Sequence, residues 1–157
     1  MLIVNDVEAI MVAFEAMIRD NIVVPPPFDT MGLVTRIWQP WDALAKIQQP
    51  ALVITEPSEE RTNRRGEQFS VTLDIKLVLY VTVDPADKVY PPNTRVNKFI
   101  EAVARSMLPR EGLDVVMNAQ TLNGLVSNVF MDGRILKDSG VIDNQGSALI
   151  PVTVLIS

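Results

Sequence analysis

The sequence contains no histidine and no cysteine. Without histidine, the Ser-His-Asp and Cys-His arrangements and the helical zinc motif are excluded, as is the side chain that most often transfers protons in catalysis. Without cysteine there can be no disulfide and no thiolate metal ligand, which fits a reducing compartment or a fold that needs no cross-links. These absences favour a protein that is not an enzyme.

Glycine is scarce as well, and no hydrophobic run is long. Seven glycines are scattered from Gly32 to Gly146, so neither a dinucleotide-binding fingerprint nor a phosphate-binding loop can be formed from them. We therefore expect no cofactor. No apolar stretch approaches the roughly 18 residues of a membrane span, and the amino terminus lacks the basic region of a secretion signal. The sequence predicts a protein that is soluble where it is made and has no membrane partner.

The apolar residues that are present suffice for one folded domain. The 157 residues are 48% hydrophobic and 21% charged, as in globular proteins with a substantial core, and this length suits a single domain over residues 1–157. The 14 Lys and Arg against 19 Asp and Glu leave a formal charge of -5. A general attraction to the phosphates of nucleic acids is therefore not expected.

The first half of the chain predicts one helix, two strands and a charged loop. Apolar residues recur at three- and four-residue intervals over 7–18, which indicates a helix with Asn5 as its N-cap. A short strand is predicted over 32–38 and a buried one over 51–55. Residues 56–68 have only polar, charged, glycine and proline side chains, so we expect a mobile loop there.

The second half predicts the rest of a sheet and a second helix. Residues 69–81 alternate between apolar and mostly polar side chains, the pattern of a long half-buried strand. Apolar spacing over 96–107 indicates a helix with Thr94 as its N-cap. Strands predicted over 125–135 and 148–156 can pair as a hairpin, because turn-forming residues connect them. The predicted fold class is α+β, a mostly antiparallel β-sheet with two α-helices packed on one face.

Four acidic residues near predicted strand ends are the only candidates for chemistry. Glu59, Glu60, Asp84 and Asp87 could supply a carboxylate pair for general acid-base catalysis. Nothing in the sequence brings two of them to one buried site, so solvated loop charges are the favoured interpretation. Residues 143–146 lack the alternating ligands and the closing glutamate of a calcium loop and predict a turn. No catalytic or metal-binding residue is predicted.

Charged side chains of both signs gather in the predicted loop over 56–68. The cluster consists of Glu59, Glu60, Arg61, Arg64, Arg65 and Glu67. Its charges cancel and no aromatic side chain is interleaved for stacking on bases, which argues against a nucleic-acid contact. A subunit contact is favoured over a plain solvated loop, because complementary charges set register and partner choice. Trp38 and Trp41 are candidate interface anchors, with core packing as the alternative.

The order of the predicted elements resembles that of the tail terminator proteins of long-tailed bacteriophages, also described as minor tail or tail completion proteins. The resemblance covers most of the chain. It includes the opening helix, the strand opening Gln49-Pro50-Ala51-Leu52-Val53-Ile54, the charged loop, the long alternating strand, the second helix and the closing strand from Ala148. The connection over 25–49, with both tryptophans, looks longer than the minimal version of that fold.

Tail terminator proteins form a hexameric ring that caps the head-proximal end of the tail tube, stops its polymerisation and joins it to the head. The resemblance therefore implies a late virion protein, made in the host cytoplasm, that forms a homohexamer. Its implied partners are the major tail tube protein and a head-tail connector or neck protein. DNA would pass through the lumen without specific binding, which an acidic surface favours. The alternatives are another neck or tail-completion ring, a host binding module, and a small carboxylate-dependent enzyme.

Overall fold

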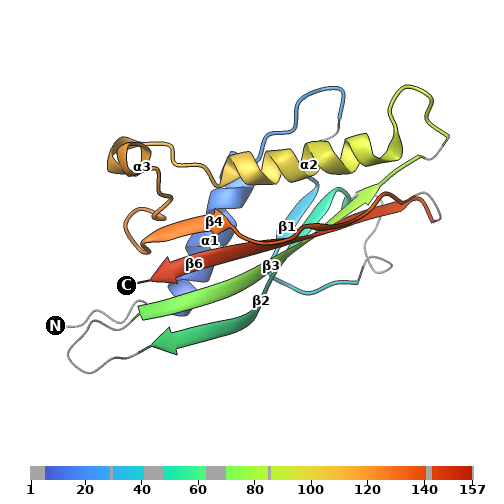
Figure 1. The fold of residues 1–157 in the computed structure, drawn as a ribbon. Helices are drawn as coiled ribbons and strands as arrows, with labels where there is room; N and C mark the ends of the chain where they lie inside the picture. The colour runs from blue at the N-terminus through green and yellow to red at the C-terminus, as the bar shows by residue number, and fades with distance from the viewer. Residues whose placement is uncertain are drawn as a thin grey trace.

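The computed structural model describes residues 6–28, 30–40, 48–62, 70–84, 86–140 and 143–156. Along the chain its elements are α1 (Val7–Asn21), β1 (Leu33–Thr35), β2 (Ala51–Thr62), β3 (Ser70–Thr82), α2 (Pro92–Ser106), α3 (Gly112–Met117), β4 (Asn128–Met131), β5 (Leu136–Asp138) and β6 (Gln145–Ile156). The three long strands, β2, β3 and β6, run side by side, and α2 lies above them in Figure 1.

In the described part of the chain, all six strands belong to one sheet, in the order β1-β2-β3-β6-β4, with β5 also paired to β6. Every pairing is antiparallel except that of β1 with β2. β6 pairs with β3 along its whole length, from Gln145 opposite Thr82 to Ile156 opposite Val71, and its other edge carries β4 and β5. The predicted α+β class, the mostly antiparallel sheet and the pairing of the last two predicted strands are confirmed.

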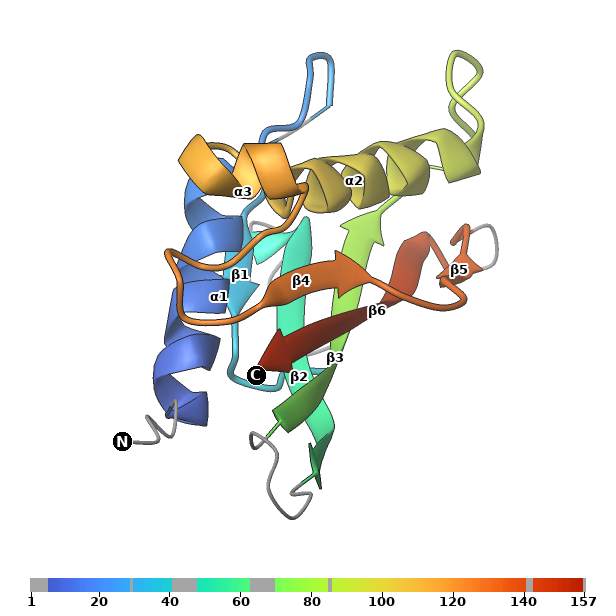
Figure 2. The ribbon, with the colours of Figure 1, turned by 60° about the vertical axis from the view of Figure 1, so that its left-hand side comes forward.

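The main hydrophobic core lies between one face of the sheet and the helices α1 and α2. Phe14 of α1, Phe99 of α2 and Leu77 of β3 are fully buried in it. Figure 2 shows α1 and α2 running in different directions against the sheet. β3 alternates between buried and half-buried residues along most of its length, as its sequence predicts. Because burial of such a side chain contributes roughly 1.5–3 kcal/mol, this face of the sheet dominates the stability of the fold.

Both predicted helix caps are wrong, although both helices are present. Asp6, and not Asn5, is the N-cap of α1, and its Oδ1 accepts a hydrogen bond from the Glu8 backbone at 2.9 Å. α2 starts earlier than predicted, at Pro92, so Thr94 lies inside the first turn and makes no capping hydrogen bond. Proline needs no N–H partner in the first turn and has a helical φ, which explains the earlier start.

The predicted mobile loop over 56–68 is wrong for its first half, because residues 56–62 continue β2. The register shifts between Thr55 and Ser58, and the strand then pairs with β3 as far as Thr62. Most side chains of this half are exposed, so no apolar alternation marks it in the sequence. Backbone hydrogen bonds to β3, and not the burial of apolar side chains, hold this half in the sheet. The remaining residues of the predicted loop lie outside the described ranges.

The smaller differences have local causes. Only Leu33–Thr35 of the strand predicted over 32–38 is formed, as β1. The strand predicted over 125–135 is shorter, because Gly133 has a φ of 113° and separates β4 from β5. The turn predicted over 143–146 is formed only by Asp143 and Asn144, because Gln145 and Gly146 already belong to β6. Earlier in the same connection, Gly140 has a φ of 78°, and a Cβ on it would lie 2.5 Å from Val83 Cγ2. Among the described residues, no helix is both long and apolar enough to span a lipid bilayer.

Candidate subunit interface

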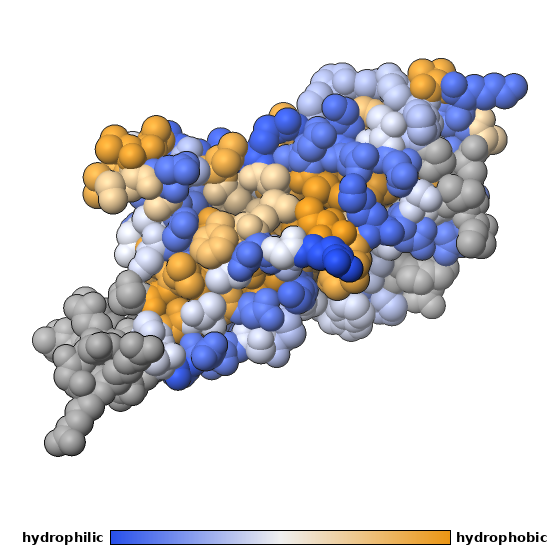
Figure 3. All heavy atoms as spheres, in the orientation of Figure 1, coloured by the Kyte–Doolittle hydropathy of each residue, from blue (hydrophilic) through white to orange (hydrophobic). Residues whose placement is uncertain are grey.

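The short helix α3 exposes every large apolar side chain that it has. Leu113, Val115, Val116 and Met117 are 73%, 53%, 79% and 67% exposed, and none of the helix is buried. We call these four side chains the α3 knob. Figure 3 shows their apolar atoms grouped at one end of the molecule. Scattered exposed apolar residues are ordinary, but four on six consecutive residues form an exposed apolar patch.

Hydrogen bonds hold α3 in this exposed place. The Asp114 carboxylate accepts bonds from the Thr121 hydroxyl at 2.8 Å and from the Thr121 backbone at 3.2 Å. Asn118 ends the helix in the left-handed conformation, with a φ of 51°. Gln120 donates to the Leu108 carbonyl at 3.0 Å, and Leu122 is buried in the core. These bonds fix the segment that follows α3, so the knob has a defined position on the fold.

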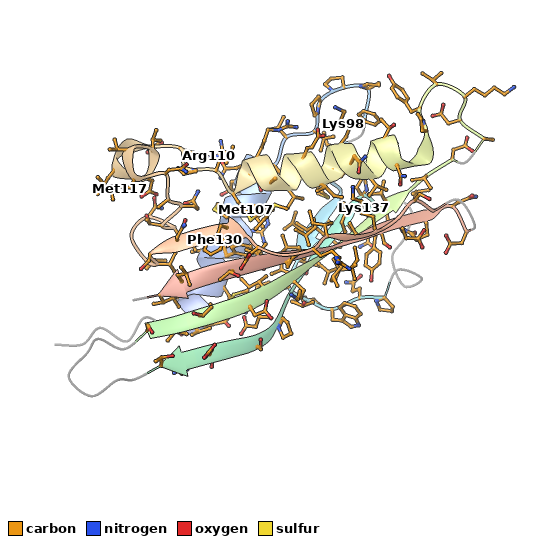
Figure 4. The ribbon with its side chains drawn as sticks, in the orientation of Figure 1. Lys98, Met107, Arg110, Met117, Phe130 and Lys137 are labelled. Atoms are coloured by element: carbon orange, nitrogen blue, oxygen red, sulfur yellow. The ribbon has the colours of Figure 1, made fainter. Side chains whose placement is uncertain are left out.

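A groove of about 830 Å³ lies between α1 and the segment that carries α3. Its apolar lining includes Ala13, Ala16, Met17, Leu113 and Leu122. Its charged lining residues are Arg110, Asp20, Glu111 and Asp114. Arg110 is exposed and donates hydrogen bonds to two backbone carbonyls at 3.3 and 3.5 Å. Figure 4 shows Arg110 and Met117 at the same end of the molecule, beyond the carboxyl end of α2. Leu113 belongs both to the knob and to the lining of the groove, so the two surfaces adjoin.

A second hollow lies at the other end of α2, where the 84–91 connection approaches its first turn. It measures about 210 Å³ and is lined by Pro27, Phe28, Val83, Asp84, Asp87, Tyr90, Pro91 and Arg95. We call it the 84–91 hollow. The rings of Phe28 and Tyr90 lie 5.3 Å apart and form its aromatic wall. Val89 stands beside them and is 75% exposed. Charged side chains, Asp84, Asp87 and Arg95, stand beside the two rings in the lining of the hollow.

The structure separates the charged residues predicted as an interface. Glu59, Glu60 and Arg61 lie on β2, with Glu59 and Arg61 on the helix side of the sheet and Glu60 on the other. Arg61 is paired with Glu59, at 3.1 Å between Nη2 and Oε1. Arg64, Arg65 and Glu67 lie outside the described residues. The charged interface predicted from the sequence stays a prediction.

The structure describes one of the two tryptophans predicted as interface anchors. Trp38 is 60% exposed, so core packing, the alternative weighed for it, is wrong. Its role as an interface anchor stays a prediction. Trp41 lies outside the described residues.

The structure separates the four acidic residues weighed for catalysis into two groups, Glu59 and Glu60 on β2 and Asp84 and Asp87 in the lining of the 84–91 hollow. Glu59 pairs with Leu73 on β3, whereas Asp84 follows the far end of β3. At about 3.3 Å per residue, the backbone from Leu73, opposite Glu59, to the end of β3 before Asp84 spans roughly 30 Å. Asp84 and Asp87 instead accept hydrogen bonds from the backbone of Ala86 and Val89 in the 84–91 connection. Within the described ranges, no three His, Cys, Asp or Glu side chains are placed to hold a metal ion.

Sequence reasoning missed α3 and the 84–91 hollow. The available signal for α3 was the mostly apolar run over 113–117, between Gly112 and Asn118. This run is too short for its periodicity to identify a helix. The hollow had no local signal, since Pro27 and Phe28 are distant in the sequence from its other lining residues, which lie within 83–95.

Comparison with models of protein families gave no match to this chain, and comparison with curated proteins gave none either.

Proposed function

We propose that this protein is a structural subunit of a bacteriophage tail: a tail terminator that forms a ring at the head-proximal end of the tail tube, ends tube polymerisation and offers a joining surface to the head. The α3 knob carries the proposal. A helix that is anchored by hydrogen bonds and buries none of its own side chains needs a partner surface, which a ring subunit provides.

Three further features support a structural role. The fold is a single sheet with two helices on one face, an arrangement that can present unlike surfaces at its two ends. The chain has no histidine for proton transfer. Its formal charge of -5 suits a channel through which DNA passes without adhering.

The proposal is tested by adding the purified chain to polymerising tail tube protein from the phage that encodes it. A tail terminator should stop elongation at substoichiometric amounts and appear as a ring at one end of each tube in negative-stain images. Deletion of the gene should give tails of uncontrolled length. Tubes of unchanged length with no bound ring, together with normal tails in the deletion mutant, would overturn the proposal.

Tube length and gene position separate the two nearest alternatives. Another neck or tail-completion ring would bind the head connector and leave tube length unchanged. A host binding module would lie outside a phage tail gene cluster, whereas a tail terminator gene should lie between the head-completion genes and the gene of the major tail protein.

A further inference from the structure

We propose that the groove between α1 and the segment that carries α3 binds a short amphipathic helix of a partner protein, with apolar side chains on one face and lysine or arginine beside them. We call it the α1–α3 groove. The partner is defined by its chemistry alone, so the inference goes beyond the ring function and does not depend on it.

The shape of the α1–α3 groove suits a helix. Its lining on α1 consists of Ala13 and the residues three, four and seven positions after it, namely Ala16, Met17 and Asp20, which share one face of the helix. At a rise of about 1.5 Å per residue, this face is about 10 Å long, or two helical turns. The two alanines have short side chains, so another backbone can approach α1 closely. An amphipathic helix is a common occupant of such a groove.

The apolar part of the groove continues onto the α3 knob. Leu113 lines the groove, belongs to the knob and is 73% exposed. Figure 2 shows α3 beside the carboxyl end of α1, so a helix that lies along α1 meets the knob at that end. The apolar face of the partner would therefore cover Met17 and Leu113 together.

The charges of the lining favour a cationic partner. Three carboxylates and one guanidinium leave the lining with a net charge of -2, from Asp20, Glu111, Asp114 and Arg110. The Asp114 carboxylate is already bonded to Thr121, and Arg110 donates to two backbone carbonyls. Asp20 and Glu111 are exposed and have no ion-pair partner in the part of the chain that the structure describes. These two carboxylates attract lysine or arginine and repel an acidic helix.

A second copy of this chain matches the groove less well. Its exposed apolar helix, α3, contains Asp114 and has no lysine or arginine. Docking of α3 would bring this carboxylate beside an acidic lining, and like charges disfavour association. The favoured occupant is therefore a segment of a different protein.

Three synthetic peptides test this chemistry. The lysine peptide has leucine at positions i, i+3, i+4 and i+7 and lysine between them, and the glutamate peptide has glutamate in place of lysine. A scrambled lysine peptide without an apolar face controls for general attraction to a chain of formal charge -5. Fluorescence anisotropy of the labelled peptides measures affinity. The lysine peptide should bind at least about tenfold more tightly than the other two.

Charge reversal in the groove should change the preference from one peptide to the other. In Asp20→Lys with Glu111→Lys, the lysine peptide should bind about tenfold more weakly and the glutamate peptide more tightly. Both residues are exposed, and a lysine in the last turn of α1 suits the helix dipole, so the fold should be unchanged in circular dichroism and thermal melts. The matched control is Glu60→Lys with Asp132→Lys, which alters the net charge equally at exposed sites outside the lining.

A separate substitution tests the apolar part of the groove. Leu113→Asn removes an exposed apolar side chain from the lining without a change of charge and should weaken the lysine peptide about fivefold. Val12→Asn is the control, because Val12 is an exposed apolar residue of α1 that does not line the groove. Binding of the lysine peptide should be the same in this control as in the unchanged chain.

Several results would overturn the inference. The unchanged chain fails to bind the lysine peptide, or the scrambled peptide binds equally well, or the control reversal weakens binding as much as the groove reversal. Self-association that the groove reversal alone abolishes would show that a second copy is the occupant. Tube capping is measured separately: peptide binding without capping contradicts the tail terminator function alone, and capping without peptide binding contradicts this inference alone.

Discussion

The Arg36 guanidinium donates hydrogen bonds to both carboxylate oxygens of Glu8, at 2.7 and 2.9 Å. Glu8 lies in the first turn of α1, and Arg36 directly follows β1, so the pair fastens the start of the helix to the edge strand. These bonds, and the positive charge behind them, lower the pKa of Glu8 from its ordinary value of 4.5. The same bonds raise the pKa of Arg36.

The first prediction is a pH dependence of this pair. Because the pKa of Glu8 is lower in the folded state, the stabilisation is fully present above about pH 4.5 and is lost as the pH falls through the folded pKa. Arg36→Gln should return the pKa of Glu8 toward its ordinary value. Carboxyl NMR titration measures this shift. Lys98→Gln, which removes the partner of Glu101, is the control; an unchanged Glu8 titration in Arg36→Gln would contradict the pairing.

The second prediction concerns the core. Leu77 of β3 and Phe99 of α2 have no exposed surface, so replacement of either by Ala leaves a cavity. Each change should lower the free energy of unfolding by about 3 kcal/mol. Chemical denaturation measures the loss, and Val12→Ala on the exposed side of α1 should change it by less than about 0.5 kcal/mol. Equal stability of all three variants would mean that these side chains do not form the core.

Elements that bury one face could be predicted from the sequence. The alternation in β3 and the helical spacing in α1 exist because every second residue, or every third and fourth, meets the core. The second half of β2 gives no such signal. Most of its side chains are exposed on both faces, and its backbone bonds to β3, with one bond from the Ser58 hydroxyl to Asp74, define it. The N-cap of α1 was misplaced by one residue because Asn5 and Asp6 are both good caps.

The candidate surfaces were harder to predict than the fold. α3 buries nothing, so no pattern relates its residues to the core. The 84–91 hollow joins Phe28 and Tyr90, which are distant in the sequence and are brought together by the tertiary fold. The charged residues Glu59 and Arg61 are exposed, as expected for a polar segment. They pair with each other because residues two apart on a strand lie on the same face, and an interpretation as a loop does not predict this pair.

The third prediction tests how α3 is held. Asp114→Ala removes the acceptor for the Thr121 hydroxyl and backbone, so the segment should open more readily, by about 1 to 2 kcal/mol. Amide hydrogen exchange at Thr121 and Gly124 reports this opening. Global stability should change little, because α3 has no buried residue. Asp114→Asn keeps one acceptor oxygen and should exchange more slowly than Asp114→Ala; equally fast exchange in both would show that the carboxylate does not anchor the segment.

The last prediction concerns the charged residues that the sequence marked for subunit contact. Arg61 is exposed and its bond to Glu59 joins neighbours on one strand, and such pairs contribute only about 0.2 to 1 kcal/mol. Arg61→Glu alone should therefore leave both fold and tail length unchanged.

Reversal of all three arginines, with Arg61, Arg64 and Arg65 each replaced by Glu, is the stronger test. An interface that relies on complementary charge loses three attractive contacts and gains three repulsive ones, whereas a solvated segment loses nothing. We expect the triple variant to fold normally by thermal melt and to fail to restore normal tail length in a phage that lacks the gene, as measured by electron microscopy. Infectious particles with tails of normal length would show that these arginines are only solvated and take no part in a subunit contact.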